Sequence, residues 1–435
     1  MRRTQPSELS ESMWQDIINY SVLAGFLLSF GLFFIRPLFL DPEHTMKFLV
    51  YLPAGDVIGL DLNQMLSYCV SFFINHGTPY IGNNLYPPLA TVLFGPLLLL
   101  DRSTAYVVIT IMSVLAYVLT VLIIPNLIVE DKNKRLIIQL LFLTGLFSYG
   151  FQFELERGQF NLIAFSLAIL AVYLFHAKPR FRLLAYVLFT LSIQLKVYPA
   201  IFLLIFVDDW LDWRNNIKRF AAIILVNISL LFVLGYQVFL DFIEGISKQA
   251  LEPHITMTNH SIKVFAELLF KKAGYRDLFL ARGMELDQIK NLAGYSNVIQ
   301  LTLQIFVISC LFIVLIRAIK TNSVGLNPYL LSVCTILTLL IPSVSNDYKL
   351  PLITGPLAIV LQVSVGLRMN IRTALGSVLL VLVGATAYST TLFSYTNKPL
   401  ILSNNLPGLL VVLLVVTIMS IFEDKNLLIN HEATA

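Results

Sequence analysis

Two stretches, DLNQMLSYCVSFF (residues 61–73) and YPPLATVLFGPLLLL (residues 86–100), decide how this chain is interpreted. The first opens on an acid, Asp61, and carries apolar side chains at helical spacing, but it is short for a membrane span. It therefore predicts a helix lying in the membrane interface. The second stretch has prolines at its start and then an apolar run, which is typical of a membrane segment. Together they predict an acid held at a membrane surface.

The composition is that of an integral membrane protein. Of 435 residues, 57% are hydrophobic and only 13% are charged, whereas soluble domains carry about 25% charged residues. We expect one all-α polytopic membrane domain over residues 1–435, a helical bundle with about 11–13 membrane segments. The three cysteines lie in apolar sequence, which favours buried thiols over a disulfide or metal framework.

The predicted membrane segments are apolar runs separated by charged or proline-containing stretches. Tyr86–Leu100 is short of a full crossing. Leu183–Val207 contains Lys196 to Pro199, where proline stops a helix and divides the run in two. The full set is Ile17–Leu40, Tyr86–Leu100, Ala105–Val129, Leu136–Phe151, Phe160–Phe175, Leu183–Val207, Phe220–Leu240, Val298–Ile319, Tyr329–Ile341, Leu350–Val365, Ala374–Phe393 and Leu406–Phe422.

Lysine and arginine residues set the expected orientation, because they favour the cytoplasmic side of a membrane. Basic residues at 218–219, 317–320 and 368–372 fall at alternate boundaries and place the C-terminal tail inside, and Arg2 and Arg3 place the N-terminus inside as well. The first outer loop (41–84, with the interfacial helix) and the long outer loop (241–297) then face out. The middle of the chain, 86–207, is ambiguous by counting. A scheme with basic residues 132–135 and 178–182 inside places Glu154–Asn161 outside.

Asp61 has two compatible interpretations. Asp61 followed by Gln64 matches a capping box, so the carboxylate would cap the interfacial helix. The alternative is a general base at the membrane surface. Asp56 is the rival acid in the same loop.

Charged and polar residues also gather beside later membrane segments, where charge is costly unless it is paired or hydrated. Glu154, Glu156 and Arg157, followed by Gln159 and Asn161, form either a Glu–Arg pair at a helix junction or a polar wall of a headgroup cavity.

Lys196, deep in apolar sequence, is either a snorkelling lysine or a phosphate contact. Asn259 and His260 in the long loop, and Asp347 and Lys349 before a later segment, are either solvated loop residues or parts of a site on the same side as Asp61. No metal-ligand spacing is present, and we expect the aromatic residues to face mostly lipid and the interface.

An ordered set of motifs carries a resemblance to a known family. An early outer aspartate, Tyr-Pro-Pro-Leu (86–89) leading into Leu-Phe-Gly-Pro-Leu (93–97), Gly-Gln-Phe-Asn (158–161) and Leu-Lys-Val-Tyr-Pro (195–199) resemble the GT-C glycosyltransferases of family GT87. That family includes polyprenyl-phosphate-mannose-dependent α-mannosyltransferases. The resemblance runs from about Asp61 to Asp209 and, more weakly, to Pro356.

The resemblance implies roles for individual residues. Asp61 matches the family's first-loop aspartate, the catalytic base. Asn259-His260-Ser261 is similar to an Asn-Gln-Ser motif, with histidine in place of glutamine. Pro342–Lys349 stands where many members have a Ser-Pro…Trp-x-His motif, and here Asp347-Tyr348 occupies the place of the tryptophan and histidine.

These observations predict an inverting glycosyltransferase in the plasma membrane of a bacterial cell, with its site outside the cytoplasm. It would move mannose or another hexose or pentose from a polyprenyl-phosphate donor to a lipid or glycan acceptor. Asp61 would be the base, and Tyr86, Lys196, Arg157 and His260 would be among the substrate contacts. We expect no cofactor, metal or nucleic acid. The alternatives are a transporter or flippase, or a polymerase, of lipid-linked glycans. A transporter or flippase would place charges and broken helices at mid-membrane, often in symmetric halves.

Overall fold

The computed structural model describes scattered residues between 13 and 27, and then 59–128 except 83, 135–146, 148–251, 259–271, 295–322, 325–364, 376–384 and 406–423. Over these residues the secondary structure is helical, and the extended pairing is an isolated antiparallel bridge between Asn259 and Asn346. The prediction of an all-α fold is confirmed. Asp56 lies outside the described residues, as does most of the first predicted membrane segment.

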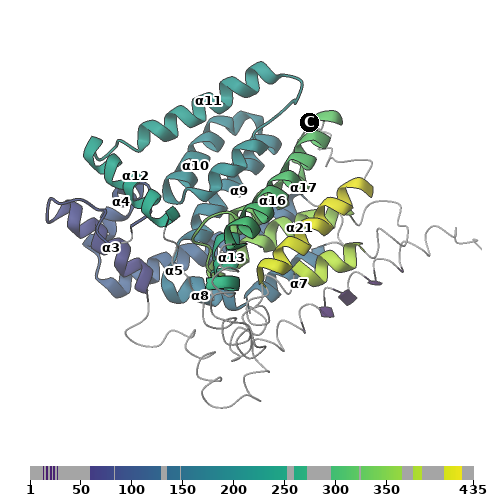
Figure 1. Cartoon of the computed structure of the whole chain (residues 1–435), viewed down its shortest axis with the longest axis horizontal. Helices are drawn as coiled ribbons and strands as arrows, with labels where there is room; N and C mark the ends of the chain where they lie inside the picture. The colour runs from purple at the N-terminus through teal and green to yellow at the C-terminus, as the bar shows by residue number, and fades with distance from the viewer. Residues whose placement is uncertain are drawn as a thin grey trace, which may run out of the picture.

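A helical hairpin lies at the centre of the bundle. Helices α9 (Asn161–Ala177) and α10 (Arg182–Leu195) pack along each other, with α5 (Arg102–Val118) beside α9 and α11 (Trp213–Leu230) beside α10 (Figure 1). Arg182 begins α10, and Lys196 follows its last residue. The basic loop 178–182 and the polar start of α9 therefore lie at opposite ends of the hairpin.

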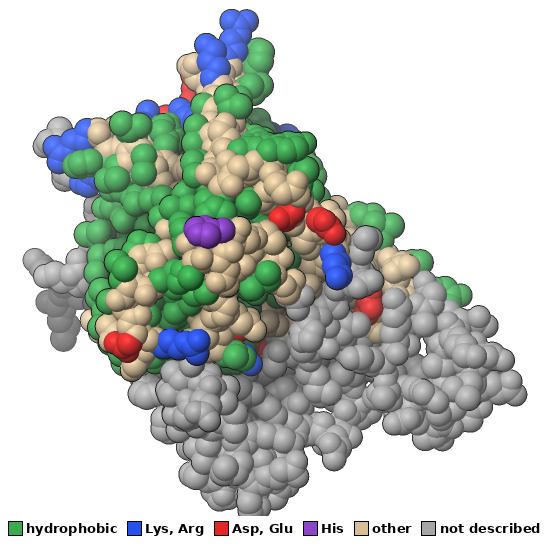
Figure 2. Space-filling model, turned by 90° about the vertical axis from the view of Figure 1, so that its left-hand side faces the viewer, with side chains coloured by type: hydrophobic (Ala, Val, Ile, Leu, Met, Phe, Trp, Pro, Cys, Tyr) green, Lys and Arg blue, Asp and Glu red, His purple; other side chains and the backbone are tan. Residues whose placement is uncertain are grey.

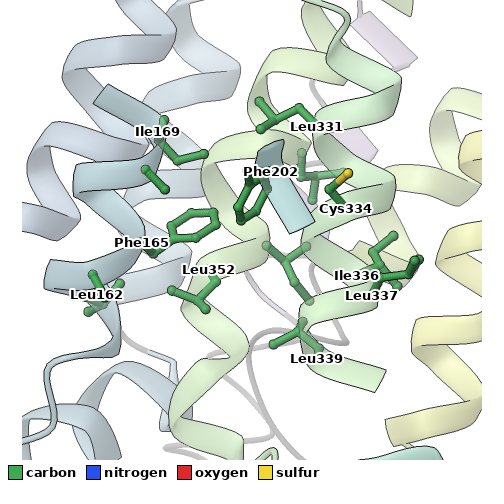
Figure 3. Close-up of a cluster of buried hydrophobic side chains, with 14 of the residues drawn as sticks. Leu162, Phe165, Ile169, Phe202, Leu331, Cys334, Ile336, Leu337, Leu339 and Leu352 are labelled. Atoms are coloured by element: carbon green, nitrogen blue, oxygen red, sulfur yellow. The ribbon is translucent and has the colours of Figure 1, made fainter. Parts of the chain in front are cut away.

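A second group of helices packs against this hairpin. It consists of α16 (Tyr295–Lys320), α17 (Pro328–Leu340), α18 (Thr354–Ser364) and α21 (Leu406–Glu423). The 3₁₀ helix η8 (Tyr198–Ile205) lies between α9 and α17, so that Phe165 and Phe202 meet with ring centroids 5.6 Å apart (Figure 3). Apolar side chains of α17, such as Leu331 and Leu337, complete this core.

Long apolar helices identify a membrane protein. Among the described residues, two helices are long and apolar enough to cross a membrane, Arg102–Ile128 and α16; a third is possible if Gly150–Arg157 and Asn161–Ala177, bent by 113°, form one broken span. The face in Figure 2 exposes many hydrophobic side chains, with Lys and Arg at its upper end and a few more, near acidic side chains, lower down. The total number of crossings stays a prediction.

Several predicted segments are broken helices. Tyr86–Leu100 forms α4 (Pro88–Phe94) and η4 (Gly95–Leu99), shorter than a full crossing. Leu183–Val207 breaks at Lys196, as predicted from the proline that follows. The prediction of one helix over Phe220–Leu240 is wrong, because α11 ends at Leu230 and α12 (Tyr236–Leu251) begins after Gly235, whose φ is 102°. Leu136–Phe151 likewise divides into α7 (Arg135–Leu146) and α8 (Tyr149–Arg157).

Basic residues of the loop 178–182 and of positions 218–219 lie together. Asp208 accepts from Arg182 at 2.9 Å and from Arg219 at 3.2 Å. This links the loop 178–182 to residues 218–219 at one end of the α9–α10 hairpin. Residues 178–182 and 154–161 therefore lie at opposite ends of the hairpin, as the scheme with 178–182 inside and 154–161 outside requires. Most of the other basic cluster, 132–135, lies outside the described residues, and the orientation stays a prediction.

Candidate active site at the start of helix α9

Asp61 lies in the first turn of α3 (Leu60–Phe73), but it does not cap the helix. The N-cap is Gly59, with φ of 69°, and it makes no side-chain cap hydrogen bond. The capping-box interpretation is therefore wrong, because the helix begins two residues too early for Asp61 to be its N-cap. The carboxylate instead faces the turn between α8 and α9 and is 17% exposed. It is therefore accessible while being held by protein groups.

The α8–α9 turn receives the start of α3 at close range. Gly59 donates its backbone N–H to the Glu156 carbonyl at 2.7 Å. Gly158 has φ of 63°, and a Cβ there would lie 2.9 Å from Cβ of Leu62. Glycine at 158 therefore supplies both the left-handed turn and the room for α3 to dock. This explains why Asp61 meets residues almost 100 positions later in the chain.

Gln159 connects the acid to a cation. Its Nε2 donates to Oδ2 of Asp61, and its Oε1 accepts from Nζ of Lys196 at 2.9 Å. The same Oε1 accepts from Asn161 Nδ2 at 3.3 Å. Asp61, Gln159 and Lys196 thus form one hydrogen-bonded line, which we call the acid–amide–lysine line.

Lys196 stands over an aromatic floor. Its Nζ lies 4.4 Å from the ring centroid of Tyr86 and 4.3 Å from that of Phe160. Those two rings pack on each other with centroids 5.0 Å apart. Cation–π attraction of this kind holds an ammonium where water is scarce. Lys196 is thus half-buried and bound within the protein, rather than snorkelling to the surface.

Glu154 supports the acid–amide–lysine line through Asn161. It is buried, and its two oxygens accept from Asn161 Nδ2 and from the Leu162 backbone N–H, each at 2.9 Å. The latter bond satisfies a free N–H in the first turn of α9. The Asn161 carbonyl accepts from the Tyr198 hydroxyl at 2.8 Å, which ties the start of η8 to the start of α9.

Arg157 and Glu156 do not form the simple pair considered from sequence. Arg157 contacts Asp61, with Nη1 and Oδ1 separated by 3.7 Å, and its guanidinium lies 5.2 Å from the ring centroid of Phe153. Glu156 is buried, and its Oε2 has no hydrogen-bond partner. A buried acceptor left open beside Asp61 is suited to a substrate hydroxyl, because an unmet buried acceptor is costly.

The predicted residues of the two later loops form a second cluster. Oδ1 of Asn259 accepts from the backbone N–H groups of Ser261 and Ser345, each at 3.1 Å. His260 donates its backbone N–H to the Ser345 carbonyl at 2.8 Å. Its ring nitrogens face Ser345 Oγ at 3.0 Å and Asp347 Oδ1 at 3.4 Å. Asn259, His260, Asp347 and Lys349 are all buried, contrary to the interpretation of these four residues as solvated.

Two ionisable groups of this cluster are perturbed by burial. Burial and then the positive charge of Lys349 hold the pKa of His260 well below its usual value. Lys349 itself is buried in η9 (Asp347–Ile353), and its Nζ donates to the Val344 carbonyl at 2.7 Å. Burial, followed by repulsion from Lys196, lowers its pKa to about 7. His260 is therefore neutral at physiological pH.

Tyr348, which was not among the predicted site residues, connects the two clusters. Its ring packs on Phe153 with centroids 5.5 Å apart, and the guanidinium of Arg157 lies over the same Phe153 ring. Burial and then the Asp61 carboxylate raise the pKa of the Tyr348 hydroxyl. The expectation that aromatic residues face mostly lipid misses these rings. The signal available in the sequence was position, because Tyr348 lies between two predicted site residues.

The arrangement offers one partly exposed carboxylate, flanked by Arg157 and, through Gln159, by Lys196. Such a group can accept a proton while the neighbouring cations stabilise a developing negative charge. Within the described residues, no three His, Cys, Asp or Glu side chains come together as a metal-binding group.

The structure is a helical membrane fold that holds the Asp61 carboxylate between two cations at one end of its central hairpin. The family model of glycosyltransferase family 87 matches residues 84–343, more than half of the chain. The chain therefore belongs to glycosyltransferase family 87. The matched segment contains Gln159, Lys196 and His260, whereas Asp61 and Asp347 lie outside it. No curated protein matches the chain.

Proposed function

We propose that this glycosyltransferase moves a sugar, mannose or another hexose or pentose, from a polyprenyl-phosphate donor to a lipid or glycan acceptor. The observation that supports the proposal is the acid–amide–lysine line, in which the carboxylate of Asp61 and the ammonium of Lys196 lie on opposite sides of Gln159. A lipid-linked donor suits this geometry, because the line lies at the end of membrane-type helices.

The proposed reaction is a single displacement. The Asp61 carboxylate takes the proton of an acceptor hydroxyl, whose oxygen attacks C1 of the donor sugar. The bond between C1 and the phosphate oxygen breaks, and its electron pair leaves with the polyprenyl phosphate. Attack opposite to the leaving group inverts the anomeric centre. A positioned base contributes typically about 10²–10⁴-fold to such a step.

Cations near the line would stabilise the leaving phosphate. Lys196 is half-buried over Tyr86 and Phe160, and Arg157 can turn from Asp61 toward a phosphate because their contact is 3.7 Å long. Charge stabilisation is strongest in a site that excludes water. Lys349, also buried, would be a further contact on the side of Tyr198, whose ring centroid lies 5.3 Å from Nζ.

The remaining predicted residues would shape the sugar site. Tyr86 supplies a ring face, and Glu156 a buried oxygen that is open to a hydroxyl. Gln159 and Asn161 hold the acid and the lysine in place. His260 bonds Asp347, and Asn259 accepts from the Ser345 backbone N–H, so we propose that these three residues act on substrate through their neighbours in η9.

The proposed location is a bacterial plasma membrane, with the site facing outside the cytoplasm. Basic residues 178–182 and 218–219 gather at the end of the α9–α10 hairpin that is far from Asn161 and Lys196. Positive residues favour the cytoplasmic side, which supports an outward-facing line. Labelling of single cysteines with an impermeant reagent at Asn75 and Lys178 checks this orientation, with Asn75 expected to react in intact cells and Lys178 not.

Purified protein in detergent tests the donor class. We expect transfer from a polyprenyl-phosphate sugar, no transfer from the corresponding nucleotide sugar, and an unchanged rate when a chelator is added. Direct transfer from the nucleotide sugar would overturn the proposal. Mass analysis of envelope glycolipids with and without the gene would then identify the acceptor.

A further inference from the structure

The strongest feature outside the acid–amide–lysine line is the buried junction between residues 259–261 and 343–349. Three of its side chains, Ser345, His260 and Asp347, are arranged in the order of a hydrolytic triad. All three are almost completely buried, and the Ser345 backbone N–H is already given to Asn259. No substrate carbonyl could reach Ser345 Oγ, so an acyl-transfer role is excluded by access.

Neutral His260 instead serves as a two-ended connector. Because the Asp347 carboxylate accepts, His260 Nδ1–H donates to it, which leaves Nε2 to accept from the Ser345 hydroxyl. The Asn259 side chain adds a bond from Nδ2 to the Ser343 carbonyl at 2.9 Å. The two chain segments are thus joined by side-chain bonds to both backbone and side chains, although they lie more than 80 residues apart.

The junction leads directly into the proposed active site. Asp347 is followed by Tyr348, whose ring packs on Phe153. The guanidinium of Arg157 lies over the Phe153 ring and contacts Asp61. Lys349, two residues after Asp347, is held by the Val344 carbonyl inside the same turn. The η9 helix that bears Tyr348 and Lys349 packs against α8, which bears Glu156 and Arg157.

We propose that Asn259, His260, Ser345 and Asp347 form a loop latch, which docks residues 259–261 onto residues 343–349 and thereby positions Tyr348 against Phe153 and holds Lys349 in η9 beside α8. Its members are positioning residues, since they bind one another and not substrate. The kinetic part of the inference rests on the proposed function, because it assumes that the Asp61 site is where the sugar moves.

The closing of the latch has a readout that needs no substrate. Ser261 is completely buried beside His260, so a thiol introduced by Ser261→Cys reacts with a maleimide only when the latch opens. Adding His260→Ala should raise the alkylation rate by about tenfold or more. His260→Gln, whose amide offers one donor and one acceptor, should restore a rate close to that of Ser261→Cys alone.

The kinetic readout uses the same changes with serine kept at 261. His260→Ala should lower kcat by roughly 10- to 100-fold with a smaller change in KM, because the donor is bound but misaligned. His260→Gln should recover most of kcat. The matched control is Asn327→Ala, which removes a buried N-cap at the other end of α17, 3.0 Å from the Leu330 N–H, and should change neither alkylation nor kcat.

Three results would overturn the latch: alkylation unaffected by His260→Ala, faster alkylation with unchanged kcat, or equal effects from Asn327→Ala. The alkylation rate is read without donor, and kcat is read with whichever donor supports transfer. Failure of the polyprenyl-phosphate donor would therefore refute the proposed function while the latch is still decided by its own measurements.

Discussion

Gln159 donates its side-chain N–H to the carboxylate of Asp61 across 98 positions of sequence. The same amide accepts from Lys196, so its orientation is set by both partners: nitrogen toward the acid and oxygen toward the lysine. A carboxylate at position 159 could still accept from Lys196, but it could not donate to Asp61. It would also place a second negative charge beside the Asp61 carboxylate.

Gln159→Glu should therefore move the pH dependence of turnover. A second carboxylate beside Asp61 disfavours the charged form of Asp61 and removes the hydrogen-bond donor that stabilises it. Because the base must be deprotonated, the acidic limb of kcat/KM should shift to higher pH. The pH profile of wild type and variant measures this. An acidic limb that stays in place would show that Gln159 does not control the base.

Lys196→Met should remove the cation while keeping a long apolar side chain over Tyr86 and Phe160. If Lys196 stabilises the leaving phosphate, kcat/KM should fall by about 10²–10³-fold, the usual loss for one such group. Lys178→Met, at the exposed end of the same hairpin, is the control and should behave as wild type. A Lys196→Met enzyme with normal turnover would remove the lysine from the mechanism.

Gly158→Ala should destabilise the α8–α9 turn. Gly158 and Gly82 share φ of 63°, but a Cβ at 158 meets Leu62 at 2.9 Å, whereas a Cβ at 82 meets nothing within 4 Å. Gly82→Ala thus measures the left-handed backbone cost alone, about 1–2 kcal/mol. Gly158→Ala should cost a further ~1–3 kcal/mol from overpacking against α3 and should reduce turnover. Thermal unfolding in detergent compares the two; equal losses would argue against tight docking of α3.

The buried side chain of Lys349 should make the free energy of unfolding depend on pH. Its pKa is about 7 in the folded protein against 10.5 for a free lysine, so between these values the unfolded chain binds more protons. Stability should therefore rise with pH through this window, by at most about 1.4 kcal/mol per pH unit. Lys349→Met should flatten that rise, while exposed Lys178→Met should not. Unfolding midpoints measured across the window decide it; parallel curves for wild type and Lys349→Met would contradict the burial of this charge.

The sequence supported the fold class and much of the site. Apolar composition and run length predicted a helical membrane protein, and proline at 199 predicted the break after Lys196, because both are local properties. Gln159 and Lys196 were chosen as polar residues in costly surroundings, and the structure does place them in contact.

Other features depend on contacts that no local pattern encodes. Asp61 does not cap its helix, because Gly59 is the N-cap. The backbone N–H of Gly59 is held by the carbonyl of Glu156 on a distant helix. From sequence, the two loop motifs resembled solvated loops, because neither is apolar. In the structure they are buried against each other and joined by hydrogen bonds. The break at Gly235 was missed because the flanking residues form one continuous apolar run.

Turnover of Asp61→Asn with a polyprenyl-phosphate sugar tests the central claim most directly. Asparagine keeps the shape and an oxygen for the Gln159 N–H, and since Asp61 is not a cap, no helix end is lost. We predict a folded variant that binds donor but turns over at least ~10²-fold more slowly, while Glu156→Gln, on α8 in the same site, keeps measurable transfer. Near-normal turnover of Asp61→Asn would contradict the account and move the search for the base to Asp56 and Asp347.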